Sequence, residues 1–251
     1  MRTETPVVAD PAREEPSTQR GLSILRPVLV LLVIALLASP SSAEVSLSLV
    51  GGWGGTTSPE ADLELGPETD LSYDAAEGSF LQYDARITWW SPRPTGWGLG
   101  LDLAWAASEI DLTPDLFFIA VQPPPDLALT SLEADLDAVT LHLLRRRVTR
   151  GTLGLPLVLY GGGGIGALVP EIRGRIGTRE IDSRELAGPR LEAVLGLESE
   201  LDPGIGLTLE ARVHYSRLAV DLPRSSSIDA DFWGASLLFG ITLRNGPLPG
   251  T

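Results

Sequence analysis

The chain has 251 residues, of which 43% are hydrophobic and 21% charged, so it can bury a core and is not disordered by composition. It contains no cysteine, which excludes disulfide frameworks, thiolate-bound metals and cysteine nucleophiles. A formal net charge of −14 argues against a nucleic-acid partner. With only two histidines, neither a metal site nor any other cofactor is predicted.

The first 43 residues have the layout of an export signal. Residues 1–20 are polar, and Arg20 and Arg26 then precede an apolar run from Pro27 to Ala38. The run is shorter than the roughly 20 residues that a membrane-spanning helix needs. It is followed by Ser41, Ser42 and Ala43, small residues of the kind found at a cleavage site. We therefore expect a cleaved signal peptide over 1–43 with a long polar n-region; an uncleaved anchor is the alternative.

The rest of the chain alternates between apolar and polar residues with a period of two, as strands do. The clearest segments are 81–89, 99–105, 191–197, 207–213 and 233–243. The pattern predicts eight strands, near residues 44–54, 79–90, 97–110, 132–147, 155–169, 188–201, 204–220 and 230–244.

The connections between these strands are alternately long and short. Long ones are expected over 55–78, 111–131, 170–187 and 221–229, and short ones over 91–96, 148–154 and 202–203. An even number of strands with long loops at one end and short turns at the other is typical of outer-membrane barrels. We therefore predict an all-β fold, an eight-stranded antiparallel up-and-down transmembrane β-barrel over 44–244, followed by a short tail over 245–251.

Aromatic residues mark both ends of the predicted strands. Trp89, Trp90 and Trp97 flank a short turn, whereas Trp53, Trp105 and Trp233 lie near the long-loop end. Such rings are typical of the aromatic girdles at membrane interfaces. Together with the export signal they favour the outer membrane. The alternative is a soluble secreted barrel with its apolar face inward.

In a membrane barrel the polar face of each strand lines the lumen, which in eight strands is narrow enough for side chains to fill. Because unpaired buried charges are costly, we expect Arg86, Arg190 and Arg212 to bridge several carboxylates. The predicted network comprises Asp84, Arg86, Asp102, Glu133, Asp135, Asp137, Arg190, Glu192, Glu198, Glu210 and Arg212. It is interpreted as a structural plug; a gated ion path is the alternative.

A glycine-rich segment from Leu159 to Ala167 resembles the Tyr-x-Gly-x-Gly-x-Gly strand of the opacity/OmpA-type family of small outer-membrane β-barrels. The segments 211–219 and 234–244 are similar to the last two strands of that family, so the resemblance spans roughly 44–244. It implies outer-membrane lipid and lipopolysaccharide as surroundings and the barrel assembly machinery as a partner.

One triplet has catalytic character. His214 and Ser216 are two residues apart on one strand face, as a general base and a nucleophile would be, and Asp229 or Asp231 lies across the following hairpin. The triplet is similar to the His-x-Ser-Asn motif of outer-membrane lipid A deacylases, with Arg217 in place of the asparagine. It implies a hydrolase as an alternative function.

Other charged and apolar segments are expected to be surface features. Seven acidic residues over 55–78 form a solvated loop or a Ca²⁺ site, and the arginines at 145–147 and 150 form an interfacial turn or a contact to anionic headgroups or peptidoglycan. Phe117, Phe118 and Ile119 on the 111–131 loop pack on the rim or bind a partner. The sequence thus predicts a non-enzymatic outer-membrane barrel with a structural or surface-binding role, possible extracellular partners being held by its long loops. The alternatives are the hydrolase and a narrow channel for small solutes.

Overall fold

The computed structural model describes residues 44–57, 60–65, 70–74, 77–108, 129–150, 155–176, 179–184, 188–222, 226–246 and 248. Side chains are described for 44–57, 79–106, 136–150, 155–171, 188–219, 229–246 and 248. The predicted signal peptide over 1–43 and the apolar residues Phe117, Phe118 and Ile119 lie outside the described residues.

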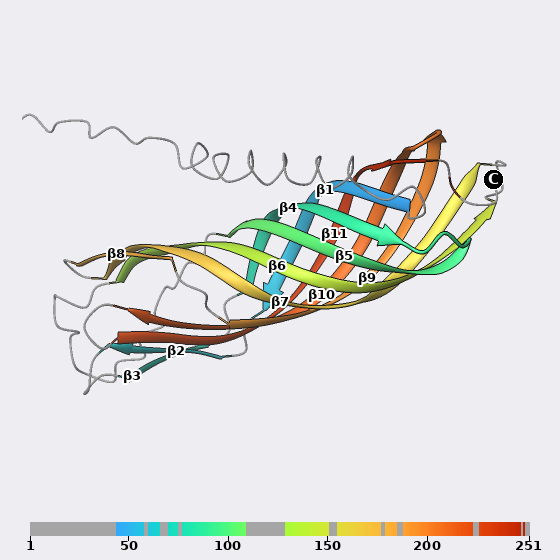
Figure 1. Ribbon diagram of the computed structural model, residues 1–251. Coiled ribbons are helices and arrows are strands. Elements are labelled where there is room, and N and C mark those ends of the chain that lie inside the picture. The colour runs from blue at the N-terminus through green and yellow to red at the C-terminus, as the bar shows by residue number, and fades with distance from the viewer. Residues whose placement is uncertain are drawn as a thin grey trace, which may run out of the picture. The chain divides into compact units, whose positions relative to one another are not determined.

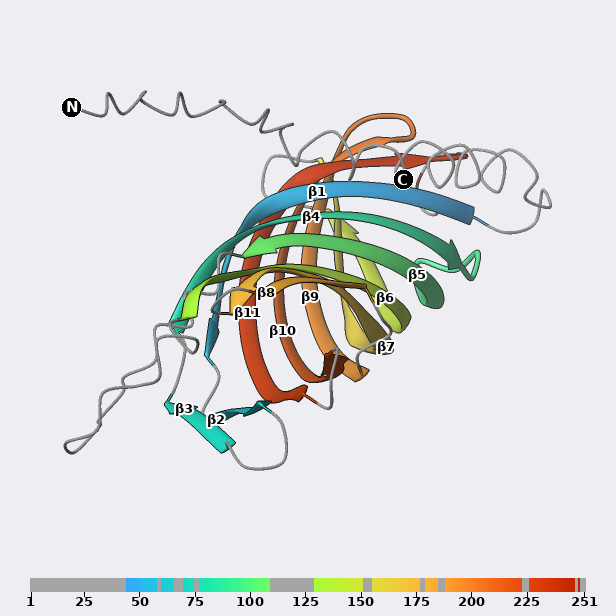
Figure 2. The same ribbon diagram turned by 90° about the vertical axis from the view of Figure 1, so that its left-hand side faces the viewer.

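Eight long strands form a closed antiparallel barrel (Figures 1 and 2). In barrel order they are β1 (Glu44–Thr57), β4 (Glu77–Trp90), β5 (Thr95–Ser108), β6 (Leu129–Arg150), β7 (Pro156–Ile176), β9 (Gly188–Asp202), β10 (Ile205–Leu222) and β11 (Ser226–Arg244). Each strand pairs with its neighbours in this order, and β1 closes the ring by pairing with both β4 and β11. The predicted fold class is confirmed.

Three shorter strands extend the sheet at the end where the long connections lie. They are β2 (Glu60–Leu65), β3 (Asp70–Asp74) and β8 (Arg179–Arg184), and Figure 1 shows all three at one end of the barrel. β2 pairs with β11 and with β3, while β8 pairs with the extended end of β7. The connections predicted as loops over 55–78 and 170–187 therefore contain strands. These strands form because neighbouring strands offer backbone hydrogen-bonding partners, which the residue types of the segments themselves do not indicate.

The opposite end of the barrel carries the short turns, the start of the first strand β1 and the end of the last strand β11. Gly204 follows Pro203 in one turn and has a φ of +83°, a conformation that glycine adopts without strain. The end of β11 is tied to the start of β1, since the amide of Asn245 donates to the carbonyl of Val45 at 3.1 Å and the Asn245 side chain accepts from the Val45 amide at 3.0 Å. We call this end the short-turn end and the other the long-loop end.

The alternation in the sequence separates two faces of the barrel wall. Many apolar side chains on the outer face, particularly those from β5 to β11, are exposed, among them Leu195 at 61% and Phe239 at 60%. On the inner face of the same two strands, Glu192, Glu198 and Ser236 are buried. A soluble barrel has the reverse arrangement. An apolar exterior around a charged interior identifies a transmembrane barrel of the outer-membrane type, which confirms that prediction.

Among the described residues, no helix is long and apolar enough to cross a membrane.

Candidate functional site

The centre of the lumen is organised around the guanidinium of Arg212, on β10. Its Nη1 atom donates to Asp84 Oδ1 at 3.2 Å and to Glu192 Oε1 at 3.1 Å, and its Nε donates to Glu210 Oε2 at 2.9 Å. Nη1 also lies 2.9 Å from Asp102 Oδ2. With a side chain only 1% exposed, Arg212 holds carboxylates from β4, β5, β9 and β10 together across the barrel.

A second arginine, Arg86 on β4, closes the network from the opposite wall. Arg86 forms two hydrogen bonds to Glu210, one of them at 3.2 Å, and its Nη2 donates to the hydroxyl of Tyr160 at 3.3 Å. Tyr160 in turn donates its hydroxyl proton to Glu210. The carboxylate of Glu210 is fully buried and accepts hydrogen bonds from three side chains, those of Arg86, Tyr160 and Arg212. These charge-assisted hydrogen bonds offset its desolvation.

The third part of the network lies on β9. Arg190 Nη2 donates to Glu192 Oε2 at 2.6 Å, and His142 Nε2 lies 3.2 Å from Glu192 Oε1. The three arginines 86, 190 and 212 therefore face four carboxylates, those of Asp84, Asp102, Glu192 and Glu210, with His142 as a further donor. Arg86 and Arg212 each contact more than one of these carboxylates, whereas Arg190 pairs with Glu192.

Toward the short-turn end a separate group of ion pairs closes the lumen. Arg146 donates to both carboxylate oxygens of Glu44, at 2.6 Å for Nη2, and also to the carbonyl of Ser91 at 3.1 Å. Arg244 lies 3.3 Å from Glu44 Oε1 and forms an ion pair with Glu198. Arg146 was expected in an interfacial cluster with Arg145 and Arg147, but β6 turns its side chain inward between theirs.

An apolar layer fills the lumen beside these ion pairs. It consists of Trp90, Leu144, Val158, Tyr160, Val194 and Leu248, all buried. The indole of Trp90 donates to Ser46 Oγ at 3.0 Å, and the guanidinium of Arg146 lies over its ring, 4.9 Å from the ring centre. Leu248 comes from the C-terminal tail, so the tail contributes to the seal. The lumen is thus occupied by side chains both at its charged centre and at its short-turn end.

Of the three acidic residues predicted for the lumen on β6, Asp137 is placed differently by the structure. Asp137 pairs in register with Trp105 and Val169. It lies on the same face of β6 as Val139, Leu141 and Leu143, which are exposed on the outer face. It therefore belongs to the outer face, which corrects the prediction. Glu133 and Asp135 belong to the same strand, and their side chains lie outside those that the structure describes. The sequence pattern misled here because this segment is apolar on both faces toward its C-terminal half.

The residues of the predicted hydrolase are divided between the two faces of the wall. His214 and Ser216 are buried on the inner face of β10. Asp231 accepts a hydrogen bond from the Tyr215 hydroxyl at 2.8 Å, and Asp229 pairs with Arg217 at 2.7 Å; both acids are on the outer face. Neither acid can orient His214 through the sheet, so this geometry does not assemble a catalytic triad.

The six tryptophans do not all belong to the girdles. Trp53, Trp97 and Trp233 are exposed on the outer face, and Trp89 and Trp105 are half-buried on the same face. Trp90 is the exception, because its indole points into the lumen as described above. Trp89 and Trp90 therefore face opposite sides of the wall, as adjacent residues of a strand do.

One cluster in the lumen has the residue types of a metal site. Donor atoms of Asp102, His142 and Glu192 lie within 4.8 Å of one another. However, the Arg212 guanidinium already approaches Asp102 and Glu192 at 2.9 and 3.1 Å. An arginine in the place of a cation does not fit a metal ion there, because the two positive charges would repel each other. The cluster is best understood as part of the ion-pair network.

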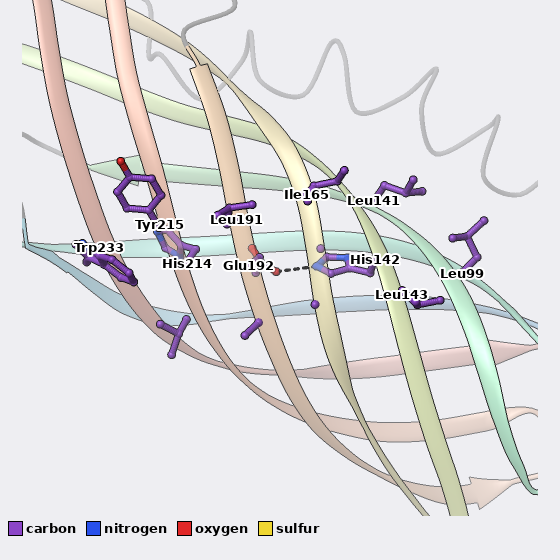
Figure 3. Close-up of a pocket in the computed structure, with 14 residues that line it drawn as sticks. Leu99, Leu141, His142, Leu143, Ile165, Leu191, Glu192, His214, Tyr215 and Trp233 are labelled. Atoms are coloured by element: carbon purple, nitrogen blue, oxygen red, sulfur yellow. Dashed lines mark hydrogen bonds and ion pairs between the residues drawn. The ribbon is translucent and has the colours of Figure 1, made fainter.

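The outer face carries a lateral depression of about 890 Å³ that runs across the strands from β5 to β11 (Figure 3). Its floor is made by small residues in register, Gly163 opposite Ala193 and Ala193 opposite Val213. Larger side chains border it, among them Leu143 on one side and Ile165, Leu191, Tyr215 and Trp233 on the other. We call this feature the lateral groove. Sequence reasoning missed it, although the glycines of β7 were noticed.

Comparison with known proteins gives similarity of fold. No protein-family model matches the chain, and no curated protein matches it. Solved structures with a similar fold include Neisserial surface protein A, with 12% identity over 81% of this chain and 97% of that one and a TM-score of 0.42. The outer membrane protein OprG from Pseudomonas aeruginosa has 13% identity, coverage of 82% and 97%, and a TM-score of 0.44. The attachment invasion locus protein Ail of Yersinia pestis has 13% identity, coverage of 78% and 99%, and a TM-score of 0.27.

Proposed function

We propose that this protein is a non-enzymatic, non-conducting barrel of the outer membrane with a structural or surface-binding role carried by its long-loop end. The observation that carries the proposal is the filled lumen. Arg212 and Arg86 tie four strands together at the centre, and the layer around Trp90 and Leu144 occupies the short-turn end. A rigid closed cylinder with strands extended beyond one rim suits a protein that presents a surface rather than one that transports a solute.

The long-loop end is the part of the molecule that is available for partners. β2, β3 and β8 enlarge that end, whereas the short turns at the other end are only a few residues long. In outer-membrane barrels the long connections face the exterior and the short turns face the periplasm. Lipopolysaccharide is therefore the expected surrounding at this rim, and an extracellular partner would meet the extended strands first.

Two alternatives have less support. A hydrolase would need an acid beside His214, but the two candidate acids pair with Tyr215 and Arg217 on the other face. A channel for ions or small solutes would need a continuous path past Arg212, whose guanidinium contacts both walls of the lumen.

Recording from planar bilayers tests whether the lumen is closed. We expect the wild-type barrel to give no stepwise conductance, because buried ion pairs and apolar side chains fill its interior. The variant for comparison is the double substitution Arg86→Ser/Glu210→Ser. It shortens both side chains of one buried ion pair and leaves the net charge unchanged. We expect small conductance steps from it. Steady single-channel steps from the wild type, in preparations whose unheated gel band shows a folded barrel, would contradict the proposal.

A further inference from the structure

The lateral groove is open because its floor lacks side chains where the backbone leaves room for them. A Cβ atom on Gly163 would meet nothing closer than the Glu192 carbonyl oxygen at 3.5 Å, which is ordinary contact. By contrast, a Cβ on the inward-facing Gly162 or Gly166 would overlap the backbone of the neighbouring strand β6. Close packing thus accounts for the inward glycines but not for Gly163, whose effect is to keep the groove empty.

The occupant of such a groove is set by its position on the wall. The groove lies on the apolar outer face, where Leu191 and Ile165 are 52% and 66% exposed. In a bilayer this face meets hydrocarbon, and a depression there gives an acyl chain more contact than a smooth wall does. At the long-loop side the paired rings of Tyr215 and Trp233, 5.1 Å apart, mark the edge of the groove.

A positive charge stands just beyond the groove on the side of the short-turn end. Arg145 is the next outward residue after Leu143 on β6, and it is paired with Trp97 on β5 and Gly161 on β7. Its guanidinium lies 5.7 Å from the Trp97 ring centre. It forms no ion pair within the part of the chain that the structure describes, and Arg147 lies on the same face. The charge complements an anionic headgroup at that membrane interface.

From these observations we infer that the lateral groove binds one acyl chain of an anionic phospholipid, whose phosphate is held by Arg145. The binding requires no ordering of the protein, because the groove is formed by strands of the barrel wall. It is independent of the role of the long-loop end, so either assignment can fail without the other. Arg145 acts through its charge, and Gly163 acts by leaving space for the chain.

Native mass spectrometry of the detergent-extracted barrel tests this binding. The probes are phosphatidylglycerol and phosphatidylcholine with identical acyl chains, and we expect the wild type to retain phosphatidylglycerol at about fivefold lower lipid concentration. Gly163→Phe fills the groove and should weaken retention of both lipids by about fivefold or more, because the acyl chain loses the contact of one or two methylene groups. Arg145→Gln should keep the retention of phosphatidylcholine and abolish the preference.

The control variant is Ile241→Phe, an exposed outward position on β11 outside the groove, which should behave as wild type. All variants must show the band shift of a folded barrel on an unheated gel. If Gly163→Phe retains both lipids as well as the wild type and Ile241→Phe do, the groove is not the binding site. If Arg145→Gln keeps the preference for phosphatidylglycerol, the headgroup contact assigned to Arg145 is wrong.

Discussion

Replacing Arg212 with alanine is expected to destabilise the barrel by about 3–5 kcal/mol, because it leaves several buried carboxylates without their shared cation. Arg212 contacts Asp84, Glu192 and Glu210 by hydrogen bonds, and the loss cannot be compensated by water in a filled lumen. The measurement is the urea concentration at which the unheated gel band of the refolded barrel moves to the unfolded position.

The matched control for this prediction is Arg217→Ala, five residues along the same strand. Arg217 forms a bidentate pair with Asp229, but its side chain is 53% exposed, compared with 1% for Arg212. An exposed pair contributes at most about 1 kcal/mol, so this variant should unfold close to wild type. Equal effects of the two substitutions would mean that the central network does not stabilise the barrel.

An arginine placed on the outer face at mid-strand is expected to cost about 2–4 kcal/mol in a bilayer. The position is Leu195, at the centre of β9 and 61% exposed on the outer face. Leu195→Arg transfers a charge into hydrocarbon if this face meets lipid. Leu201→Arg, at the turn end of the same strand, is the matched control and should cost about 0–1 kcal/mol.

Urea unfolding in lipid vesicles, followed by tryptophan fluorescence, measures both substitutions. A large difference between positions 195 and 201 is the signature of a membrane around the barrel. Exposed surface positions of a soluble protein usually change stability by less than about 0.5 kcal/mol, so two small and equal effects would show that the outer face meets water.

Most of the fold could be predicted from the sequence because a strand has a fixed period of two. Alternation such as that of Leu191 to Leu197 specifies both the strand and the face that each residue takes. The strands β2, β3 and β8 could not be predicted, since they form only against neighbours that extend past the rim. Outer-membrane barrels tolerate such extensions because these lie beyond the apolar band.

The interior was partly predictable for the same reason. Arg86 and Arg212 stand at inward positions of clearly alternating strands, so their burial follows from the pattern. Their partners do not, because contacts such as that of Arg212 with Asp84 join strands far apart in the sequence and depend on the tilt of the barrel. Tyr160 and His142 also belong to the network but were not among the predicted members. Both alternate with outward-facing apolar residues of their strands, so their inward position could have been predicted.

The contributions of Glu44 and Arg244 to the short-turn end show a further limit of sequence reasoning. They lie at the two ends of the barrel sequence and meet only because β1 and β11 are neighbours in the closed sheet. Together with Arg146 and Glu198 they form ion pairs that no local pattern indicates. Part of the group of ion pairs that closes the short-turn end of the lumen therefore forms only when the barrel closes.

The central claim, a barrel that spans the outer membrane with its long-loop end outside, is tested most directly by labelling single cysteines on intact cells. The chain has no cysteine of its own, so each introduced thiol is unique. Thr57→Cys stands at the long-loop end of β1 and Thr95→Cys at the short-turn end of β5, both at exposed positions. With a membrane-impermeant maleimide we expect position 57 to be labelled on intact cells and position 95 only after lysis. Labelling of position 95 alone, or of neither position until lysis, would contradict the claim.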